Sequence, residues 1–378
     1  MDPQQTFCPH RECPARGQVA QGNIVIHSQK EQRYRCKVCG KTFSARHGTV
    51  FFGCRVDTNI ITLVLTLLAY GCPIAAIEAA FGFQARTVRG WMQAAGAHCE
   101  KVHQELVMQP RALGQVQADE LRVRVQKDKA AGGPGVLWMA MALAVPTRLW
   151  LGGVLSRARD KKLIARLAAL IHACCLPGPL LLAVDGLSSY VSALRQAFRY
   201  PLRTGERKRP RLLAWPQVVI GRVIKQYGKG CGGRRCVVGV KRCLAQGSER
   251  LLGQLLRATQ DKGQGVLNTA FIERLNATFR ARLAPLVRRT RGLARRETML
   301  QAGMYLVGTV YNFCTLHDSL TLGQGPQRTP AMAAGITTHR WSVAELLWHR
   351  VPPPRWTPPK RRGRRSKAMQ QLIQRWAA

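Results

Sequence analysis

Apolar residues recur with a helical period just after the first fifty residues of the chain. Residues 60–69 form one apolar stretch that ends before Gly71, and a second stretch covers 74–81 and stops at Gly82. Glycine at these positions is typical of helix ends, and a third helical pattern follows directly. A short helix, a glycine turn and a further helix are the order of a helix-turn-helix, which we predict for residues 53–108.

The third of these segments carries polar side chains in its first turns. On a helix, Arg86, Thr87 and Arg89 would face outward while Val88 and Trp91 pack inward. In a helix-turn-helix the outward residues enter the major groove of DNA. Because the motif is short and degenerate, an ordinary three-helix bundle with a charged face is the alternative.

Strand patterns replace the helical period in the next part of the chain. The segment 116–125 alternates, two apolar runs meet at Pro146, and a further apolar run, 180–184, ends in Asp185. A helical segment at 159–174 precedes the last run. Three strands, a helix and another strand are typical of the start of a ribonuclease H-like core, although spacing alone leaves other α/β arrangements open. We predict an α/β fold with a mixed sheet, and a ribonuclease H-like domain at 109–322.

Residues 199–262 have the pattern of an inserted β-hairpin. Two strand-like segments, 215–227 and 236–243, flank a glycine-rich turn that contains Arg234 and Arg235. We expect this basic hairpin to hold the phosphate backbone of a nucleic acid. The spacing of its cysteines, Cys231, Cys236 and Cys243, fits no common metal site, and we interpret them as structural thiols.

The C-terminal segment, residues 323–378, is rich in proline and basic residues. Its part at 352–367 has too much proline and charge to fold alone. We interpret it as a flexible arm for the phosphate backbone, with a plain solvated tail as the alternative.

Charge narrows the class of partner. The chain has 59 Lys and Arg against 19 Asp and Glu, for a net charge of +40, which favours nucleic acid over an anionic membrane surface. The longest apolar stretch, 136–155, is interrupted by Pro146 and Arg148, so two buried strands fit it better than a membrane span. The 13 scattered cysteines and the polar N-terminus favour a reduced cytosolic compartment over a disulfide scaffold.

Four cysteines near the N-terminus suggest a metal site. Cys8 and Cys13 form one pair, and Cys36 and Cys39 form a second pair in a strand-turn-strand pattern at 34–43. Two such pairs suit a tetrahedral four-sulfur Zn²⁺ site in a zinc ribbon over residues 1–52. Four unrelated thiols are the alternative, and the wider spacing of the first pair favours it.

Three acidic positions stand out in this basic chain. Asp185 follows a buried strand, where α/β sheets build sites; Asp119 or its neighbour Glu120 interrupts an alternating strand; and Glu273 lies on an amphipathic helix. We favour Asp119 over Glu120, because adjacent strand residues point to opposite faces. Each acid has a structural alternative: Asp185 could cap a turn, and Glu273 could form a helix ion pair with a nearby arginine.

Carboxylates placed in this way suit a magnesium site. Mg²⁺ prefers carboxylate oxygens together with substrate phosphate. Two such ions can activate an attacking oxygen and stabilise the leaving one during phosphodiester transfer. Asp119, Asp185 and Glu273 are therefore candidate ligands of Mg²⁺ or Mn²⁺.

With these motifs assembled, the chain resembles bacterial insertion-sequence transposases of the DDE class that carry an N-terminal zinc ribbon and helix-turn-helix. The resemblance covers nearly the whole chain and rests on four segments, 34–43, 117–120, 183–186 and 268–276 continuing to 283. The last is the most specific.

The resemblance implies a ribonuclease H-like fold in which Asp119, Asp185 and Glu273 form the metal-binding triad. It also implies that Asn276 and Arg280 support Glu273 or contact the DNA. The segment 311–317 departs from the family, because Thr315 and Leu316 stand where Arg and Pro are usual. For His317 we therefore expect a packing role.

The expected function is Mg²⁺-dependent cleavage at the ends of a mobile element and transfer of the freed 3′-hydroxyls into target DNA, that is, phosphodiester hydrolysis and transesterification. The partners would be double-stranded DNA at the terminal inverted repeats and at the target, and a homo-oligomer of at least two subunits that pairs the two ends. The alternatives are a non-catalytic, sequence-specific DNA-binding protein, such as a regulator or an inactive element copy, and a nuclease of the same fold.

Overall fold

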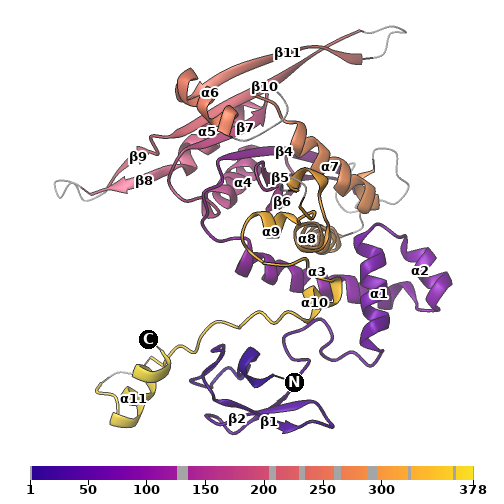
Figure 1. The fold of residues 1–378 in the computed structure, drawn as a ribbon, viewed down its shortest axis with the longest axis vertical. Coiled ribbons are helices and arrows are strands. Elements are labelled where there is room, and N and C mark those ends of the chain that lie inside the picture. Colours follow the sequence, from indigo (N-terminus) through magenta and orange to yellow (C-terminus); the bar gives the residue numbers. More distant parts are fainter. Residues whose placement is uncertain are drawn as a thin grey trace. The chain divides into compact units, whose positions relative to one another are not determined.

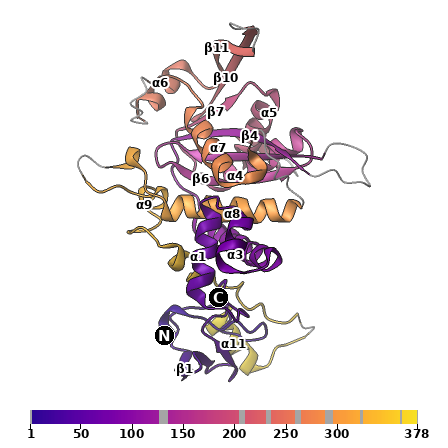
Figure 2. The same cartoon turned by 90° about the vertical axis from the view of Figure 1, so that its right-hand side faces the viewer.

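The computed structural model describes residues 2–125, 135–203, 210–229, 235–258, 265–287, 296–321, 325–360 and 363–377. The chain forms two compact units, which Figures 1 and 2 show in two views. One consists of Met1–Thr62 together with Ala344–Ala378, and the other of Leu63–Val343.

The first unit is built on a three-stranded antiparallel sheet in the order β1-β2-β3. Its elements are η1 (Pro3–Gln5), β1 (Ile24–Ser28), β2 (Arg33–Cys36), β3 (Thr42–Ser44), most of α10 (Val343–Trp348) and α11 (Lys367–Trp376). The predicted strand-turn-strand segment is confirmed. Gly40 has a φ of 70°, a left-handed conformation that glycine adopts without strain, and its N–H donates to the carbonyl of Cys36 over 2.8 Å.

Beyond the segment 352–367, which we interpret as a flexible arm, the end of the chain forms a helix that packs against this sheet. Ser366 caps α11 by accepting a hydrogen bond from the N–H of Met369. Trp376 is only 4% exposed and belongs to the same apolar core as Cys13 and Tyr34. The proline-rich composition of the preceding segment hides this helix, because α11 is short and gains its stability from tertiary packing.

The second unit begins with the three predicted helices. These are α1 (Thr58–Ala69), which crosses from the first unit, α2 (Ile74–Phe81) and α3 (Ala85–Leu106). Gly82 ends α2 with a φ of 69°. The helix α3 runs on along α8 (Glu297–Cys314), and a Cβ added at Gly96 would lie 2.3 Å from the Cα of Ala302. Glycine therefore lets these two backbones meet.

A six-stranded mixed sheet forms the centre of the second unit, in the order β11-β10-β7-β4-β5-β6. Its strands are β4 (Gln115–Arg124), β5 (Val136–Ala144), β6 (Leu149–Ser156), β7 (Leu180–Asp185), β10 (Val218–Lys229) and β11 (Arg235–Gln246). The strands β4 and β6 are each antiparallel to β5, which lies between them, whereas β7 is parallel to β4 and β10 is parallel to β7. The α/β class and the mixed sheet are confirmed.

The expected hairpin exists, but it is not a separate insertion. Its first strand, β10, pairs with β7 over Val218–Val223 and thereby extends the central sheet. Beyond this point β10 pairs only with β11 among the described strands, and the two run on past the sheet (Figure 1). A strand pattern cannot reveal which neighbour a strand will pair with, so the hairpin could be predicted from the sequence but its place in the sheet could not.

Helices cover both faces of the sheet near its centre. On one face, α7 (Ala270–Arg282) contacts β4 and β5. On the other, α4 (Lys161–Ala173) contacts β5 and α5 (Ser188–Ala197), and Tyr190 of α5 reaches Glu120. Alternate side chains of β4 are therefore covered on both sides.

The remaining described elements lie around this core. They are β8 (Arg199–Leu202), β9 (Arg211–Ala214), α6 (Glu249–Ala258), η3 (Ala284–Leu286), η4 (Asp318–Leu320) and α9 (Pro330–Ala333). The apolar stretch 136–155 forms β5 and β6, as predicted. In the described part of the chain, no helix combines the length and apolar character that a membrane span needs.

We expect Trp376→Ala to lower the free energy of unfolding of the first unit by about 3–5 kcal/mol, the usual cost of removing a buried tryptophan. Limited proteolysis and denaturant unfolding would measure it. Gln371→Ala, at an exposed position of the same helix, is the matched control and should leave stability unchanged. Equal stability of the two variants would contradict the packing of α11 on the three-stranded sheet.

Candidate functional site

The three predicted acids lie around one pocket at the centre of the second unit. The pocket has a volume of about 360 Å³ and includes Asp119, Asp185 and Glu273 in its lining. Two basic side chains, Arg159 and Lys225, line it as well. Segments far apart in the sequence thus bring three carboxylates and two cations to one place.

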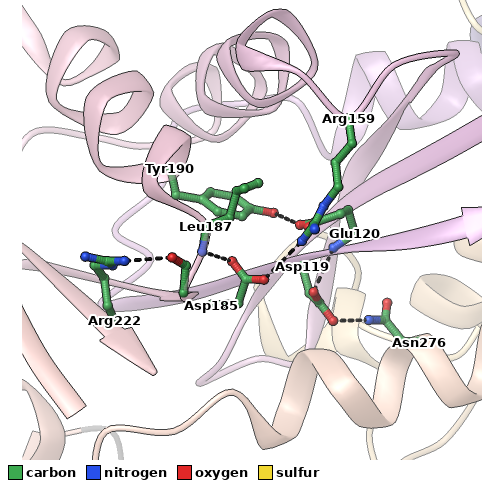
Figure 3. Close-up of polar contacts among 9 residues, drawn as sticks. Asp119, Glu120, Arg159, Asp185, Leu187, Tyr190, Arg222 and Asn276 are labelled. Carbon is green, nitrogen blue, oxygen red and sulfur yellow. Dashed lines mark hydrogen bonds and ion pairs between the residues drawn. The ribbon is translucent and has the colours of Figure 1, made fainter. Parts of the chain in front are cut away.

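Asp185 is the last residue of β7, where the strand passes into α5. Its Oδ1 accepts the N–H of Leu187 over 2.9 Å (Figure 3). Its Oδ2 lies 3.4 Å from Nη2 of Arg159. Asp185 therefore caps the turn through Oδ1, as one interpretation expected, while Oδ2 faces the other charged groups of the site.

Asp119 and Glu120 point to opposite faces of β4, as predicted for strand neighbours. Asp119 lines the pocket and accepts a hydrogen bond from Nδ2 of Asn276 over 2.8 Å. The Glu120 side chain is 1% exposed and is held by Arg159 and by the Tyr190 hydroxyl. Helices lie on both faces of the sheet here, with Asn276 of α7 beside Asp119 and Tyr190 of α5 beside Glu120.

The carboxylates of β4 and β7 form a compact group. One oxygen each from Asp119, Glu120 and Asp185 lies within 4.8 Å of the others, close enough to hold a metal ion. Glu273 is not in this group and reaches the pocket from α7. Its side chain is 44% exposed and pairs with Nζ of Lys225 over 2.7 Å, and it also accepts from the Thr269 hydroxyl over 2.8 Å.

Asn276 has a different role from the one expected. It is 1% exposed and donates to Asp119, so in this structure it neither contacts Glu273 nor presents its amide to DNA. Arg280, on the same helix, is half-buried. The predicted apolar stripe of α7 is confirmed at Leu275 and Phe279, which are buried.

Gln117 links the strand of Asp119 to the helix of Glu273. Its Oε1 accepts the N–H groups of Phe271 and Ile272, each over 3.0 Å. Its Nε2 donates to the carbonyl of Asn268 over 2.8 Å. The N-cap residue Thr269 makes no side-chain capping bond. Asn268 accepts the first N–H group of the helix, and a glutamine from another element satisfies the second and third.

Sequence reasoning missed Gln117 as a positioning residue, along with Arg159, Tyr190 and Lys225. Gln117 is the first residue of the segment 117–120, and its position two residues before Asp119 on a strand indicates that the two side chains share a face. Nothing near Arg159, Tyr190 or Lys225 distinguishes them from the many other basic and aromatic residues, because their partners are distant in the sequence.

Burial raises the pKa of Asp119 to about 7, and the neighbouring charge of Glu120 and then those of Asp185 and Glu273 contribute to the shift. Burial also raises the pKa of Glu120, and the charge of Asp185 adds to the effect. A buried carboxylate surrounded by others is costly unless a cation neutralises it, so the donor set fits a divalent metal ion.

The four predicted cysteines also converge. Sγ of Cys8 lies 3.7 Å from that of Cys39, and Sγ of Cys13 lies 3.8 Å from that of Cys36. All four sulfurs lie within 4.8 Å of one another. A tetrahedral site with metal–sulfur bonds of about 2.3 Å places its sulfurs about 3.8 Å apart. The wider spacing of the first pair is therefore compatible with a four-sulfur metal site.

The predicted DNA-binding residues are placed as follows. Arg86, Thr87 and Arg89 are exposed on the first turns of α3, while Val88 and Trp91 are buried, as predicted. Arg235 begins β11, which also carries Cys236 and Cys243. Arg234 and Cys231 lie outside the described residues.

His317 packs against Tyr311, with ring centroids 4.8 Å apart. Burial, together with the charges of Arg148 and Arg282, lowers the pKa of His317 to about 4. A neutral, packed histidine is in line with the role expected for it.

No family model and no curated protein matches this chain. The site therefore has to be interpreted from its own geometry.

We expect Asp119→Asn to stabilise the metal-free protein at pH 8 and to have little effect near pH 4. An acid whose pKa is raised by folding, here from 3.8 to about 7, destabilises the native state increasingly as pH rises between these values. The full effect is at most about 4 kcal/mol, at 1.36 kcal/mol for each pKa unit. Denaturant unfolding in chelator across this pH range would measure it.

Addition of Mg²⁺ at pH 8 should stabilise the wild type and not Asp119→Asn. Glu249→Gln, an exposed acid outside the pocket, is the control and should respond as the wild type does. A stabilisation by Asp119→Asn that is the same at every pH would argue against the crowding of carboxylates.

We also expect one thiophilic metal ion bound for each chain, lost in Cys36→Ser and kept in Cys54→Ser, whose thiol lies outside the cluster. A structural four-sulfur ion contributes about 10–16 kcal/mol to folding in small domains. The first unit of Cys36→Ser should accordingly become protease-sensitive. Elemental analysis would check this, and equal metal content in both variants would refute it.

Proposed function

We propose that this protein is a DDE-type DNA transposase. The observation that carries the proposal is that Asp119, Asp185 and Glu273, which come from β4, β7 and α7, line one pocket in a chain of net charge +40. A structural ion pair would account for one such acid. Three acids at one pocket, with too few cations beside them, are better explained by bound metal and phosphate.

The order of the strands supports a ribonuclease H-like core. Three antiparallel strands, β6-β5-β4, are followed by two parallel ones, β7 and β10. The acids then lie at two adjacent central strands, β4 and β7, with the third supplied by a later helix. This is the arrangement implied by the sequence resemblance to transposases.

In the proposed site Asp119, Asp185 and Glu273 would hold Mg²⁺ or Mn²⁺. Such ions, when bound, activate an attacking oxygen and stabilise a leaving one. The protein orients the ligands: Asn276 fixes Asp119, the N–H of Leu187 fixes Asp185, and Thr269 holds Glu273. Lys225 neutralises Glu273 and is available to contact phosphate.

The other parts would bind DNA. The four thiols would hold structural Zn²⁺ in the ribbon, and the exposed residues Arg86, Thr87 and Arg89 would read the terminal repeats from α3. The paired ends of β10 and β11 would follow the phosphate backbone. Because two element ends must be joined, we propose that at least two subunits act together in the bacterial cytoplasm.

The test is cleavage and strand transfer in Mg²⁺ on DNA that carries the sequences flanking the gene. Asp119→Asn, Asp185→Asn and Glu273→Gln should each lower the rate at least about 100-fold, since each removes a group that the transition state needs. Glu249→Gln should keep wild-type activity, and all four variants should still bind DNA.

Other outcomes distinguish the rival functions. Cleavage without joining would indicate a nuclease of the same fold. Specific DNA binding by a folded wild type that has no activity, with no difference between it and Asp185→Asn, would indicate a non-catalytic binding protein and overturn the proposal.

A further inference from the structure

Arg159 enters the pocket from the loop between β6 and α4, and its orientation is fixed (Figure 3). Its Nε donates to Oε1 of Glu120 over 2.5 Å, and its Nη2 donates to the same oxygen. The guanidinium carbon lies 5.1 Å from the centre of the Trp138 ring. A charged fork held on one side by a carboxylate and resting on an aromatic ring has few other orientations.

Glu120 is suited to anchor this arginine. One of its oxygens, Oε1, is taken by Arg159, and the other, Oε2, accepts the Tyr190 hydroxyl over 2.8 Å. The Glu120 side chain is 1% exposed, and Tyr190 is also buried. Both oxygens are therefore occupied by protein donors on the face of β4 opposite Asn276.

Of the three guanidinium nitrogens, Nη1 remains available, because Nε and Nη2 donate to Glu120 and Nη2 also lies 3.4 Å from Oδ2 of Asp185. Arg159 has five N–H groups, and Nη1 makes no hydrogen bond to any residue in the part of the chain that the structure describes. The side chain is 39% exposed, and it lines the same pocket as Asp119 and Asp185. A phosphate oxygen is the ligand that an arginine fork beside carboxylates suits best, since it accepts from the fork while its charge is shared with bound cations.

The geometry points to Arg159 as the residue that binds a non-bridging oxygen of the phosphodiester to be cut, with Glu120 and Tyr190 as positioning residues that aim it. This inference rests on the proposed function. It gives Glu120, the fourth acid of the site, the role of holding Arg159 in place rather than that of a metal ligand. The competing explanation is that the guanidinium only takes the place of a cation among the acids.

The experiment compares two duplexes that carry an element end. They are identical except that the mapped scissile phosphate is either normal or replaced by an uncharged methylphosphonate. Binding is measured by fluorescence anisotropy in Ca²⁺, after checking that no product forms. The preference of the wild type for the charged duplex should exceed that of Arg159→Ala by about tenfold or more, the value of one hydrogen bond between charged groups.

Several variants separate positioning from folding. Arg159→Lys keeps the charge without the fork, and Glu120→Gln and Tyr190→Phe loosen its anchor, so each should lose part of the preference while thermal unfolding shows a folded protein. Arg166→Ala, in which an exposed arginine of α4 is removed, should behave as the wild type does.

Two results would overturn the inference while leaving the transposase proposal intact. One is an unchanged preference in Arg159→Ala and Arg159→Lys. The other is half-maximal cleavage by Arg159→Ala at a lower Mg²⁺ concentration without loss of rate, which would show that the guanidinium merely occupies a cation's place. A wild type that cuts no phosphodiester would overturn both proposals.

Discussion

The hydrogen bonds of Gln117 to the start of α7 are the contact on which the pocket depends. Gln117 is fully buried, and its side chain accepts two backbone N–H groups and donates to Asn268. Asp119 stands two residues further along the same face of β4, and Glu273 lies in the first turn of α7. One side chain therefore sets the distance between two acids. Loss of this cap would leave buried N–H groups unsatisfied, at about 1–3 kcal/mol each.

The same pocket shows how a basic protein can hold a cluster of acids. Arg159 and Lys225 compensate Glu120 and Glu273, whereas Asp119 is held by the amide of Asn276, which carries no charge. The result is an uncompensated carboxylate whose pKa is raised to about 7, chiefly by burial. Such an arrangement lowers the stability of the folded protein in the absence of a cation, and carboxylates with a shifted pKa are found most often at functional sites.

Both ends of the chain contribute to the first unit. The cysteines come from the first forty residues, and Trp376 closes the same core from the end of the chain. Gln18 donates to the carbonyl of Trp376 over 2.6 Å, which fixes the last turn of α11. A four-sulfur site has a small apolar core of its own, so added packing of this kind stabilises it. The basic segment before α11 is thus tethered at its far end.

The sequence by itself determined the local elements: the three helices from Thr58 to Leu106, the strands β4 to β7, the cysteine pairs and the three acids with their strand or helix positions. These follow from apolar periodicity and turn residues, which act over a few positions. Only the tertiary structure decided that β10 joins the central sheet and that α11 packs on the three-stranded sheet. It also decided that Asn276 donates a hydrogen bond to Asp119, and that Glu120 accepts hydrogen bonds from Arg159 and Tyr190. Each of these depends on a partner far away in the sequence, and no local pattern records such a partner.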